Sequence, residues 1–488
     1  MQRFRAKERN NEWRERRRFF RPQRARENMT VTAASTAASA AKLPGLPPGP
    51  KGTPLLGLAL HVLRDPLATL MRVAREYGDI VCIPVFRHYR IMLNHPDFIE
   101  QVCIKQHTKF HKSTLTKDVT QRLLGQGLLI SEGDFWRRQR RLAQPAFHRT
   151  RIAEYGTTMV ECASMHMRRW YDGEVCDIAQ EMMGMTLDIA VRTLFGTTLS
   201  VKAEEVGKSL GFLMRYSMRK ARSPIKVPES WPTPRNRRAE RETQFLDSLV
   251  YGIIKERQAE GNTNPHNDLL ALLMGAMDED GTQMTPKQLR DETMTLFMAG
   301  HETTALTLSW TWYMLSENPA AEARLHEELQ RVLGGRPPEV ADLERLPYLR
   351  AVVSEVLRLY PAAYILARTS IAPCSIGGYD FPTDTTFIMA QWVMHRDARY
   401  FDEPEAFRPE RWLDGLENRL PAGAYFPFGD GPRRCIGQGF ALLELGMVIA
   451  TVAQKFRFKL VPGHRVVPDP LVTLRAKYGI QVKVHARE

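Results

Sequence analysis

One cysteine of the chain lies among residues that could hold a large, charged cofactor. The segment from Phe428 to Gly437 reads FGDGPRRCIG, and its glycines allow the backbone to come close to a flat ligand. Cys435 precedes an apolar helical run, so we expect the helix dipole and free N–H groups to stabilise its thiolate. Arg433 adds positive charge for an anionic group. A lone cysteine is ordinarily an inert core residue, but this pattern favours a functional thiolate.

A second group of interest lies in the middle of the longest predicted helix, where residues 299–304 read AGHETT. Small residues in a helix often serve close packing, and the Thr303 hydroxyl can bond back to the carbonyl of Ala299. Because Gly300 adjoins that carbonyl, the helix could open here into a groove with room for dioxygen.

Two charged or aromatic pairs recur at helical spacing. Glu355 and Arg358 are three residues apart, and Trp136 and Arg140 are four apart, so each pair shares one helix face. Solvated surface positions are the ordinary explanation for both pairs.

The cysteine segment resembles the haem-binding loop of cytochrome P-450 enzymes. That loop has the pattern Phe-x-x-Gly-x-Arg-x-Cys-x-Gly, which the chain matches at Phe428, Gly431, Arg433, Cys435 and Gly437. The resemblance covers roughly residues 43–486. It implies a mainly α fold with small β-sheets, in which haem b lies between the long distal helix and the helix after the cysteine loop.

The resemblance also implies a role for each site residue. Cys435 would be the axial thiolate ligand of the haem iron, and Phe428 would pack against its loop. Glu302 would relay protons and Thr303 would hold the water that delivers them, whereas His301 matches a variable position and is interpreted as structural. The residues expected to contact the haem or its propionates are Trp136, Arg140, Arg368, Phe428, Arg433 and Cys435.

Glu355 and Arg358 gain a partner under this resemblance, namely Arg411 of the segment FRPERW at residues 407–412. The three side chains would form a buried triad that holds the loop carrying Cys435. We expect a structural role for this triad and no catalytic one.

Helix signals place the elements that must position these residues. Thr285-Pro286-Lys287-Gln288 predicts a helix start and Asn318-Pro319 an end, so one helix should span residues 286–317. A second should span about 347–359, and a third should run from just after Cys435 to about Val452. Residues 80–83 and 480–484 have the pattern of short strands.

The N-terminal region differs in composition from the rest. Residues 1–28 hold ten Arg and one Lys against four Glu, a net charge of +7 out of +14 for the chain. We expect residues 1–42 to be a disordered basic arm with an Ala/Ser/Thr linker, and residues 43–488 to be the catalytic domain. Binding to a membrane surface or nucleic acid, an export signal, and Met29 as the true start remain alternatives for the arm, although no nucleic-acid partner is expected.

The six cysteines contain no CxxC pair and no close metal-ligand spacing, which favours free thiols in a reducing compartment, the cytoplasm. No run of about 18 apolar residues occurs, so a transmembrane anchor is not expected.

The resemblance predicts a monooxygenase that inserts one atom of O₂ into an apolar small molecule, such as a fatty acid, terpenoid or steroid-like compound. Electrons would come from a separate ferredoxin or flavodoxin with its reductase. Haem-thiolate peroxygenases or isomerases are the alternative enzyme class, and a non-catalytic haem sensor or nucleic-acid binder is a third possibility.

Two further sets of residues follow from the predicted geometry. An acidic electron donor could be steered by the basic residues near the cysteine side of the haem, which are Arg137, Arg138, Arg141 and Arg434. The substrate could be lined by residues of one helical stripe and two other segments, which are Thr295, Ala299, 110–130 and 362–366.

Overall fold

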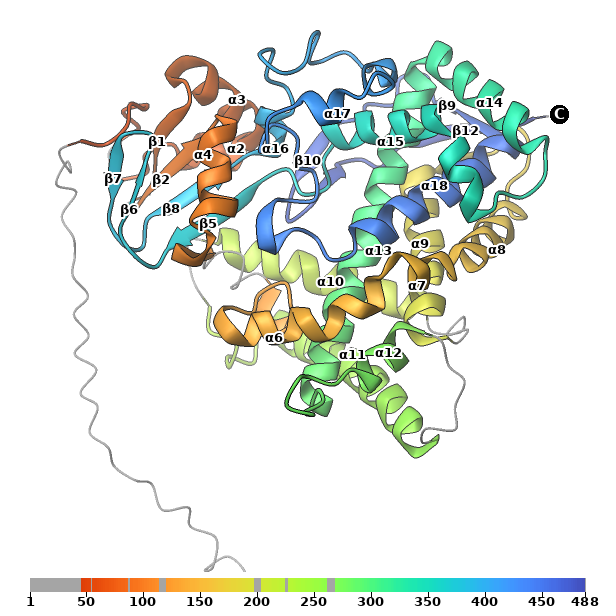
Figure 1. Ribbon diagram of the computed structural model, residues 1–488, viewed down its shortest axis with the longest axis horizontal. Coiled ribbons are helices and arrows are strands. Elements are labelled where there is room, and N and C mark those ends of the chain that lie inside the picture. Colours follow the sequence, from red (N-terminus) through yellow and green to blue (C-terminus); the bar gives the residue numbers. More distant parts are fainter. Residues whose placement is uncertain are drawn as a thin grey trace, which may run out of the picture. The chain divides into compact units, whose positions relative to one another are not determined.

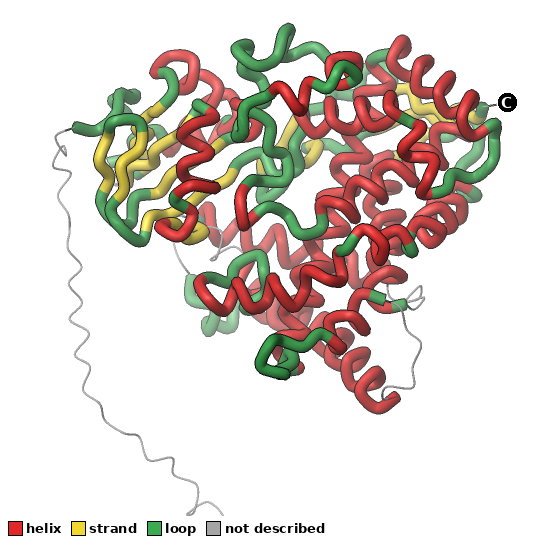
Figure 2. The backbone as a smooth tube through the Cα atoms, in the orientation of Figure 1, coloured by secondary structure: helices red, strands yellow, loops and turns green. Residues whose placement is uncertain are grey.

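The computed structural model describes residues 45–53, 55–86, 88–113, 120–196, 203–223, 227–260 and 268–487. These residues form a mainly helical fold with small β-sheets, as predicted (Figure 1; Figure 2). The predicted arm and linker lie outside the described residues, so a boundary at residue 43 stays a prediction. Within the described ranges, no helix is both long and apolar enough to cross a bilayer.

Sixteen α-helices occur in the described ranges, and α13 is the longest of them (Figure 1). Their bounds are α2 (Ala59–Arg64), α3 (Pro66–Tyr77), α4 (Pro96–Glu100), α6 (Gly133–Ala143), α7 (Arg149–Ala153), α8 (Gly156–Met167), α9 (Ile178–Phe195), α10 (Ala203–Arg222), α11 (Pro234–Glu260), α12 (Leu269–Gly275), α13 (Pro286–Glu317), α14 (Pro319–Leu333), α15 (Pro347–Leu359), α16 (Gln391–Met394), α17 (Leu416–Arg419) and α18 (Gln438–Lys455).

The three helices predicted from the sequence are confirmed. Helix α13 has the expected bounds, because Thr285 and Gln288 form a reciprocal capping box at its start and Asn318 ends it. Helix α15 also has its predicted bounds, and α18 begins three residues after Cys435 and continues to Lys455, somewhat beyond the expected end.

The strands form four small sheets. Their bounds are β1 (Ile80–Val85), β2 (His88–Leu93), β3 (Phe110–Lys112), β4 (Val175–Asp177), β5 (Leu366–Ser370), β6 (Cys374–Ile376), β7 (Tyr379–Phe381), β8 (Thr386–Met389), β9 (Phe456–Leu460), β10 (Pro468–Pro470), β11 (Leu474–Ala476) and β12 (Gln481–Ala486). The largest sheet has the order β1-β2-β8-β5-β3, with β2 and β8 parallel and the other pairs antiparallel. Both predicted strands are therefore present, as β1 and β12.

Helix α13 runs through the helical region and borders two apolar cores (Figure 1). Its C-terminal half packs with α8, α9, α14, α15 and α18, where the Trp310 ring stacks on Tyr360 with centroids 4.2 Å apart. Its N-terminal half packs with α9, α10, α11 and α12. Packing on both halves holds the middle of α13, which carries Thr303, in a defined position.

Candidate active site

The loop that carries Cys435 is shaped by glycine and by backbone hydrogen bonds. Gly431 has φ +66°, and a Cβ atom at this position would lie 2.0 Å from the carbonyl oxygen of Cys103, so only glycine fits. The Cys435 N–H donates to the Phe428 carbonyl at 2.9 Å. Of the six cysteines, all of them described and free, Cys435 alone is exposed. Its sulfur is thus accessible at the end of a tightly built loop.

The environment of the Cys435 thiol differs from the expectation in one respect. The surrounding protein raises the pKa of this thiol, because desolvation outweighs the hydrogen bond from the Gly437 N–H and the nearby charges of Arg140, Lys112 and Arg434. Helix α18 starts only at Gln438, and the expected lowering of the pKa is not found. A thiolate at this position fits a bound metal cation as its partner, since metal binding releases the thiol proton.

Four cations gather next to the cysteine loop. Strand pairing places Lys112 of β3 opposite Arg368 of β5. Burial lowers the pKa of the Lys112 ammonium well below its usual range, and the charges of Arg368, Arg433 and Arg140 lower it further. Glu132 is a carboxylate within this group, where it accepts hydrogen bonds from the Lys112 N–H at 2.7 Å and from Arg433.

This cation cluster (Lys112, Arg140, Arg368 and Arg433) has more positive charge than its protein partners neutralise. Among the described residues, no ion pair joins Arg140 or Arg368 to a carboxylate; their guanidinium groups donate to the carbonyl oxygens of Arg434 at 2.8 Å and Ala367 at 3.0 Å. Four buried or half-buried cations beside one carboxylate fit a dianionic ligand such as the two propionates of haem.

Trp136 and Arg433 are brought together as the sequence predicted for haem-contacting residues. The Arg433 guanidinium lies 3.7 Å from the centre of the Trp136 ring, which is buried. Burial lowers the pKa of Arg433 to about 10, despite the neighbouring Glu132. Arg433 also donates to the Ser131 carbonyl at 2.8 Å. Its contacts with residues 131 and 132 were not predicted.

The middle of α13 has accessible surface on one stripe only. From residue 289 to 312, every residue is buried except Leu296, Ala299, Gly300 and Thr303. These residues follow the spacing of three and four that defines one helix face. The Thr303 hydroxyl donates to the Ala299 carbonyl at 2.6 Å, and a Cβ added at Gly300 would meet no atom within 4 Å. The predicted back-bond and the open groove beside it are therefore present.

Glu302 has partners that the sequence did not indicate. Its Oε1 accepts hydrogen bonds from Arg475 Nη2 at 2.6 Å and Nε at 2.9 Å, and also from the Thr473 hydroxyl. Its carboxylate is almost fully buried and its charge is balanced by a strand, β11. His301 is likewise buried, and its Nε2 lies 3.1 Å from the Met183 carbonyl, which agrees with a structural role.

The predicted triad is formed as expected. Glu355 and Arg358 are both fully buried and are joined by hydrogen bonds of 2.8 and 2.9 Å, while Arg411 Nε donates to Glu355 at 3.1 Å. Glu355 also accepts from Trp412 Nε1 at 2.8 Å and from the Arg408 N–H at 2.9 Å. The Glu355 carboxylate is thus fully committed to structural bonds.

The loop before α6 is bound to α13 by two adjacent carboxylates. Asp291 accepts from the Gln126 N–H and Glu292 from the Leu128 N–H, both at 2.9 Å. Burial raises the pKa of Glu292 to about 7. Thr295, expected to line the substrate, is instead covered by this loop, since a Cβ on Gly127 would lie 1.9 Å from its hydroxyl.

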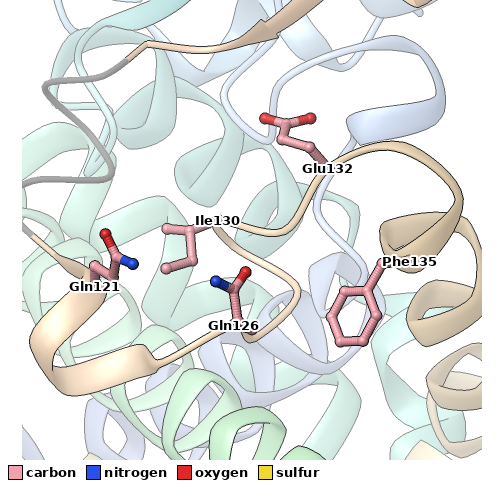
Figure 3. A pocket seen from close by; sticks show the side chains of 5 residues that line it. All are labelled: Gln121, Gln126, Ile130, Glu132 and Phe135. Carbon is pink, nitrogen blue, oxygen red and sulfur yellow. The ribbon is translucent and has the colours of Figure 1, made fainter. Parts of the chain in front are cut away.

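A cavity of about 430 Å³ lies beside the same loop (Figure 3). Its walls are formed by polar and apolar side chains within the segment predicted to approach the substrate, and by residues next to it, namely Gln121, Gln126, Ile130, Glu132 and Phe135. Cys435 and the accessible stripe of α13 do not line it. Because it shares Glu132 with the cation cluster, we regard it as a neighbour of the candidate site and not as its centre.

The arginines expected to steer an electron donor are partly neutralised. Arg138 and Arg141 both pair with Asp278, at 3.0 and 2.7 Å, and Arg137 pairs with Asp134 at 2.6 Å. Arg137 and Arg141 nevertheless remain more than half exposed at the surface.

Sequence reasoning missed three residues that matter to the site, which are Lys112, Glu132 and Arg475. Lys112 and Glu132 belong to the segments flanking residues 114–119, and only the pairing of β3 with β5 shows that Lys112 faces the arginines. The sequence held one usable signal, a buried-strand pattern at FHK that ends in an uncompensated lysine.

Comparisons with known proteins agree with this geometry. Residues 47–484 match the family model described as Cytochrome P450. Cyclooctatin synthase of Streptomyces melanosporofaciens is 35% identical over 88% of this chain and 93% of its own length. Cyclooctat-9-en-7-ol 5-monooxygenase of the same organism is 33% identical over 90% of this chain and 95% of its own length. Pentalenene oxygenase of Streptomyces avermitilis is 31% identical over 90% of this chain and 97% of its own length.

The match spans the cysteine loop, the cation cluster, the triad and the accessible stripe of α13. The chain therefore belongs to the cytochrome P450 family and is a haem-dependent monooxygenase.

Proposed function

We propose that this enzyme hydroxylates or epoxidises a terpenoid, with haem b bound through the sulfur of Cys435. The observation that carries the substrate class is the set of three Streptomyces relatives, whose names refer to the terpenoids cyclooctatin and pentalenene. When bound, the haem supplies an iron centre that activates O₂ with two electrons from outside.

The accessible stripe of α13 supports an apolar substrate. Three of its four members, Leu296, Ala299 and Gly300, offer only hydrocarbon or backbone surface. The fourth, Thr303, directs its hydroxyl proton to the Ala299 carbonyl, and the neighbouring Glu302 charge is paired with Arg475. A wall with no free charge favours a ligand that is bound mainly by apolar contact.

In this proposal the chain's own residues have separate tasks. Lys112, Arg140, Arg368 and Arg433 hold the two propionates, and Trp136 and Phe428 support the loop and helix on the cysteine side. Thr303 holds a water near the reacting oxygen through its lone pairs. Glu302 passes protons toward that water when its contact with Arg475 loosens.

Electrons reach such an enzyme from a redox partner, and we propose a ferredoxin or flavodoxin with its reductase. The exposed Arg137 and Arg141 would steer an acidic partner toward the cysteine side. The six free thiols favour a reducing compartment, and we infer a cytoplasmic location from them.

A ligand screen followed by turnover tests the substrate class. The purified haem enzyme is titrated with cyclic terpenes, terpene alcohols, fatty acids and steroids, and the haem spin-state spectrum is recorded. We expect cyclic terpenoids to shift the spectrum, and ¹⁸O from labelled O₂ to enter their products when ferredoxin and reductase are supplied. Spectral shifts and labelled products from fatty acids or steroids, with none from terpenoids, would contradict the proposal.

A further inference from the structure

His395 is a fully buried histidine that the motif analysis did not single out. It follows α16 directly, and its side chain is 0% exposed. Its Nε2 accepts a hydrogen bond from the Phe426 N–H at 3.0 Å. Phe426 lies at the start of the loop that leads to Cys435, so this bond ties a side chain from a distant segment to that loop.

The same histidine also contacts the helix that carries the triad. Its carbonyl oxygen accepts from Arg358 Nη1 at 2.7 Å, and its ring lies against the backbone of Leu357 and Arg358 at the end of α15. The rings of Tyr425 and Phe426 enclose it, with centroids 5.0 and 5.4 Å away. His395 therefore lies between the triad and the cysteine loop and bonds to both.

The bond to Phe426 defines the protonation state of the imidazole. Because Nε2 accepts a hydrogen, the ring must be neutral with its proton on Nδ1. Burial, aided by the charges of Arg358 and Arg396, lowers the pKa of His395 to about 3, which agrees with a neutral ring. His395 can thus act as a constant acceptor.

A short series of backbone bonds connects this contact to the sulfur-bearing residue. The Phe426 carbonyl accepts from the Gly429 N–H at 2.9 Å, which closes a turn that includes Phe428. The Phe428 carbonyl in turn accepts from the Cys435 N–H at 2.9 Å. A shift of Phe426 would therefore move the carbonyl to which the Cys435 backbone is bonded.

We propose that His395 is a positioning residue, whose Nε2 acceptor holds the cysteine loop against the Glu355–Arg358–Arg411 triad and so keeps the Cys435 sulfur in place for iron. This inference rests on the proposed role of Cys435 as the iron ligand. It assigns a defined task to the triad, which is to hold a histidine that in turn holds the loop, in line with the effect of outer residues on metal ligands.

Two amide variants separate this role from a general need for a polar side chain. In His395→Gln the side-chain oxygen lies as many bonds from Cα as Nε2 does, so it can still accept from the Phe426 N–H. In His395→Asn the amide reaches only the Nδ1 position, which leaves the Phe426 N–H buried without its acceptor. Both variants are neutral and lack the ring, so each is the control for the other.

The readout is the spectrum of the reduced, carbon-monoxide-bound holoenzyme, recorded on protein whose fold is verified by circular dichroism. We expect His395→Gln to retain the red-shifted band of thiolate ligation. We expect His395→Asn to shift the balance toward the shorter-wavelength band of a lost thiolate by about tenfold, the typical effect of one unsatisfied buried N–H.

Equal spectra for the two folded variants would overturn the role of His395. If both fail to fold, the ratio of the two bands is measured in wild type and in Phe426→Pro, which removes the N–H donor and leaves His395 in place. An unchanged ratio would again overturn it. A wild-type enzyme without the red-shifted band would contradict the role of Cys435 itself, so the two failures are distinguishable.

Discussion

Arg475 donates two hydrogen bonds to a single oxygen of Glu302, from Nη2 at 2.6 Å and from Nε at 2.9 Å. Thr303, the next residue, instead donates its hydroxyl proton to the Ala299 carbonyl. The acid and the alcohol of α13 thus have separate partners, one in strand β11 and one within the helix. This separation suggests different tasks, which can be tested one side chain at a time.

Glu302→Gln should slow turnover by about 10²-fold, the low end of the effect of a general acid–base group. The Gln oxygen can still accept from Arg475, so haem content and thermal midpoint should stay close to wild type. Product formation and reductant consumption are measured at saturating substrate, with Arg475→Lys as the variant that keeps the positive charge. Wild-type turnover in Glu302→Gln would exclude this carboxylate from the proton path.

Thr303→Ala should change the fate of the electrons more than their rate of use. Without the hydroxyl, a water beside the reacting oxygen loses its anchor, and we expect most of the consumed reductant to appear as hydrogen peroxide. Thr303→Ser keeps a hydroxyl and should retain most of the coupling. The ratio of product to reductant, with peroxide assayed in parallel, decides the matter; equal ratios in Thr303→Ala and wild type would remove Thr303 from the account.

Glu355→Gln should destabilise the fold by about 3–5 kcal/mol, because it leaves buried Arg358 and Arg411 without their counter-charge. The comparison is Glu344→Gln, which breaks a surface pair with Arg149 and should cost less than about 1 kcal/mol. Urea unfolding of the two holoenzymes measures the difference. Similar midpoints for both variants would mean that the buried triad contributes no more than a surface ion pair.

Reduction by an acidic ferredoxin should slow by roughly tenfold or more between low and high salt, since exposed cations steer the encounter. Arg141→Glu should slow it further, but Arg141 also holds Asp278. Asp278→Asn is therefore the control, because it removes the ion pair and leaves the arginine charge. Stopped-flow reduction rates that depend neither on salt nor on Arg141 would place the donor elsewhere.

The sequence predicted those parts of the fold that local signals encode. The bounds of α13 followed from the capping residues Thr285 and Gln288 and from Pro319, because helix ends depend on near neighbours. The cysteine loop and the triad followed from short patterns that resemble a known family. The back-bond of Thr303 to Ala299 was likewise predictable, since both residues share one helix turn.

Contacts between distant segments were not predictable in this way. Glu302 and Arg475 are separated by 173 positions, and nothing near either residue indicates the other. Lys112 joins the arginines only because β3 pairs with β5. Thr295 has the correct helical phase to line the substrate, yet Gly127 covers it, which depends on how the loop before α6 folds back.

The identity of the iron ligand is the central claim, and one spectrum tests it most directly. Wild type and Cys435→Ser are reduced, exposed to carbon monoxide and scanned, with Cys176→Ser as the control because Cys176 is a half-buried free thiol in another sheet. We predict the red-shifted Soret band of thiolate ligation in wild type and Cys176→Ser, and its loss in Cys435→Ser. A red-shifted band that persists in Cys435→Ser would contradict the account.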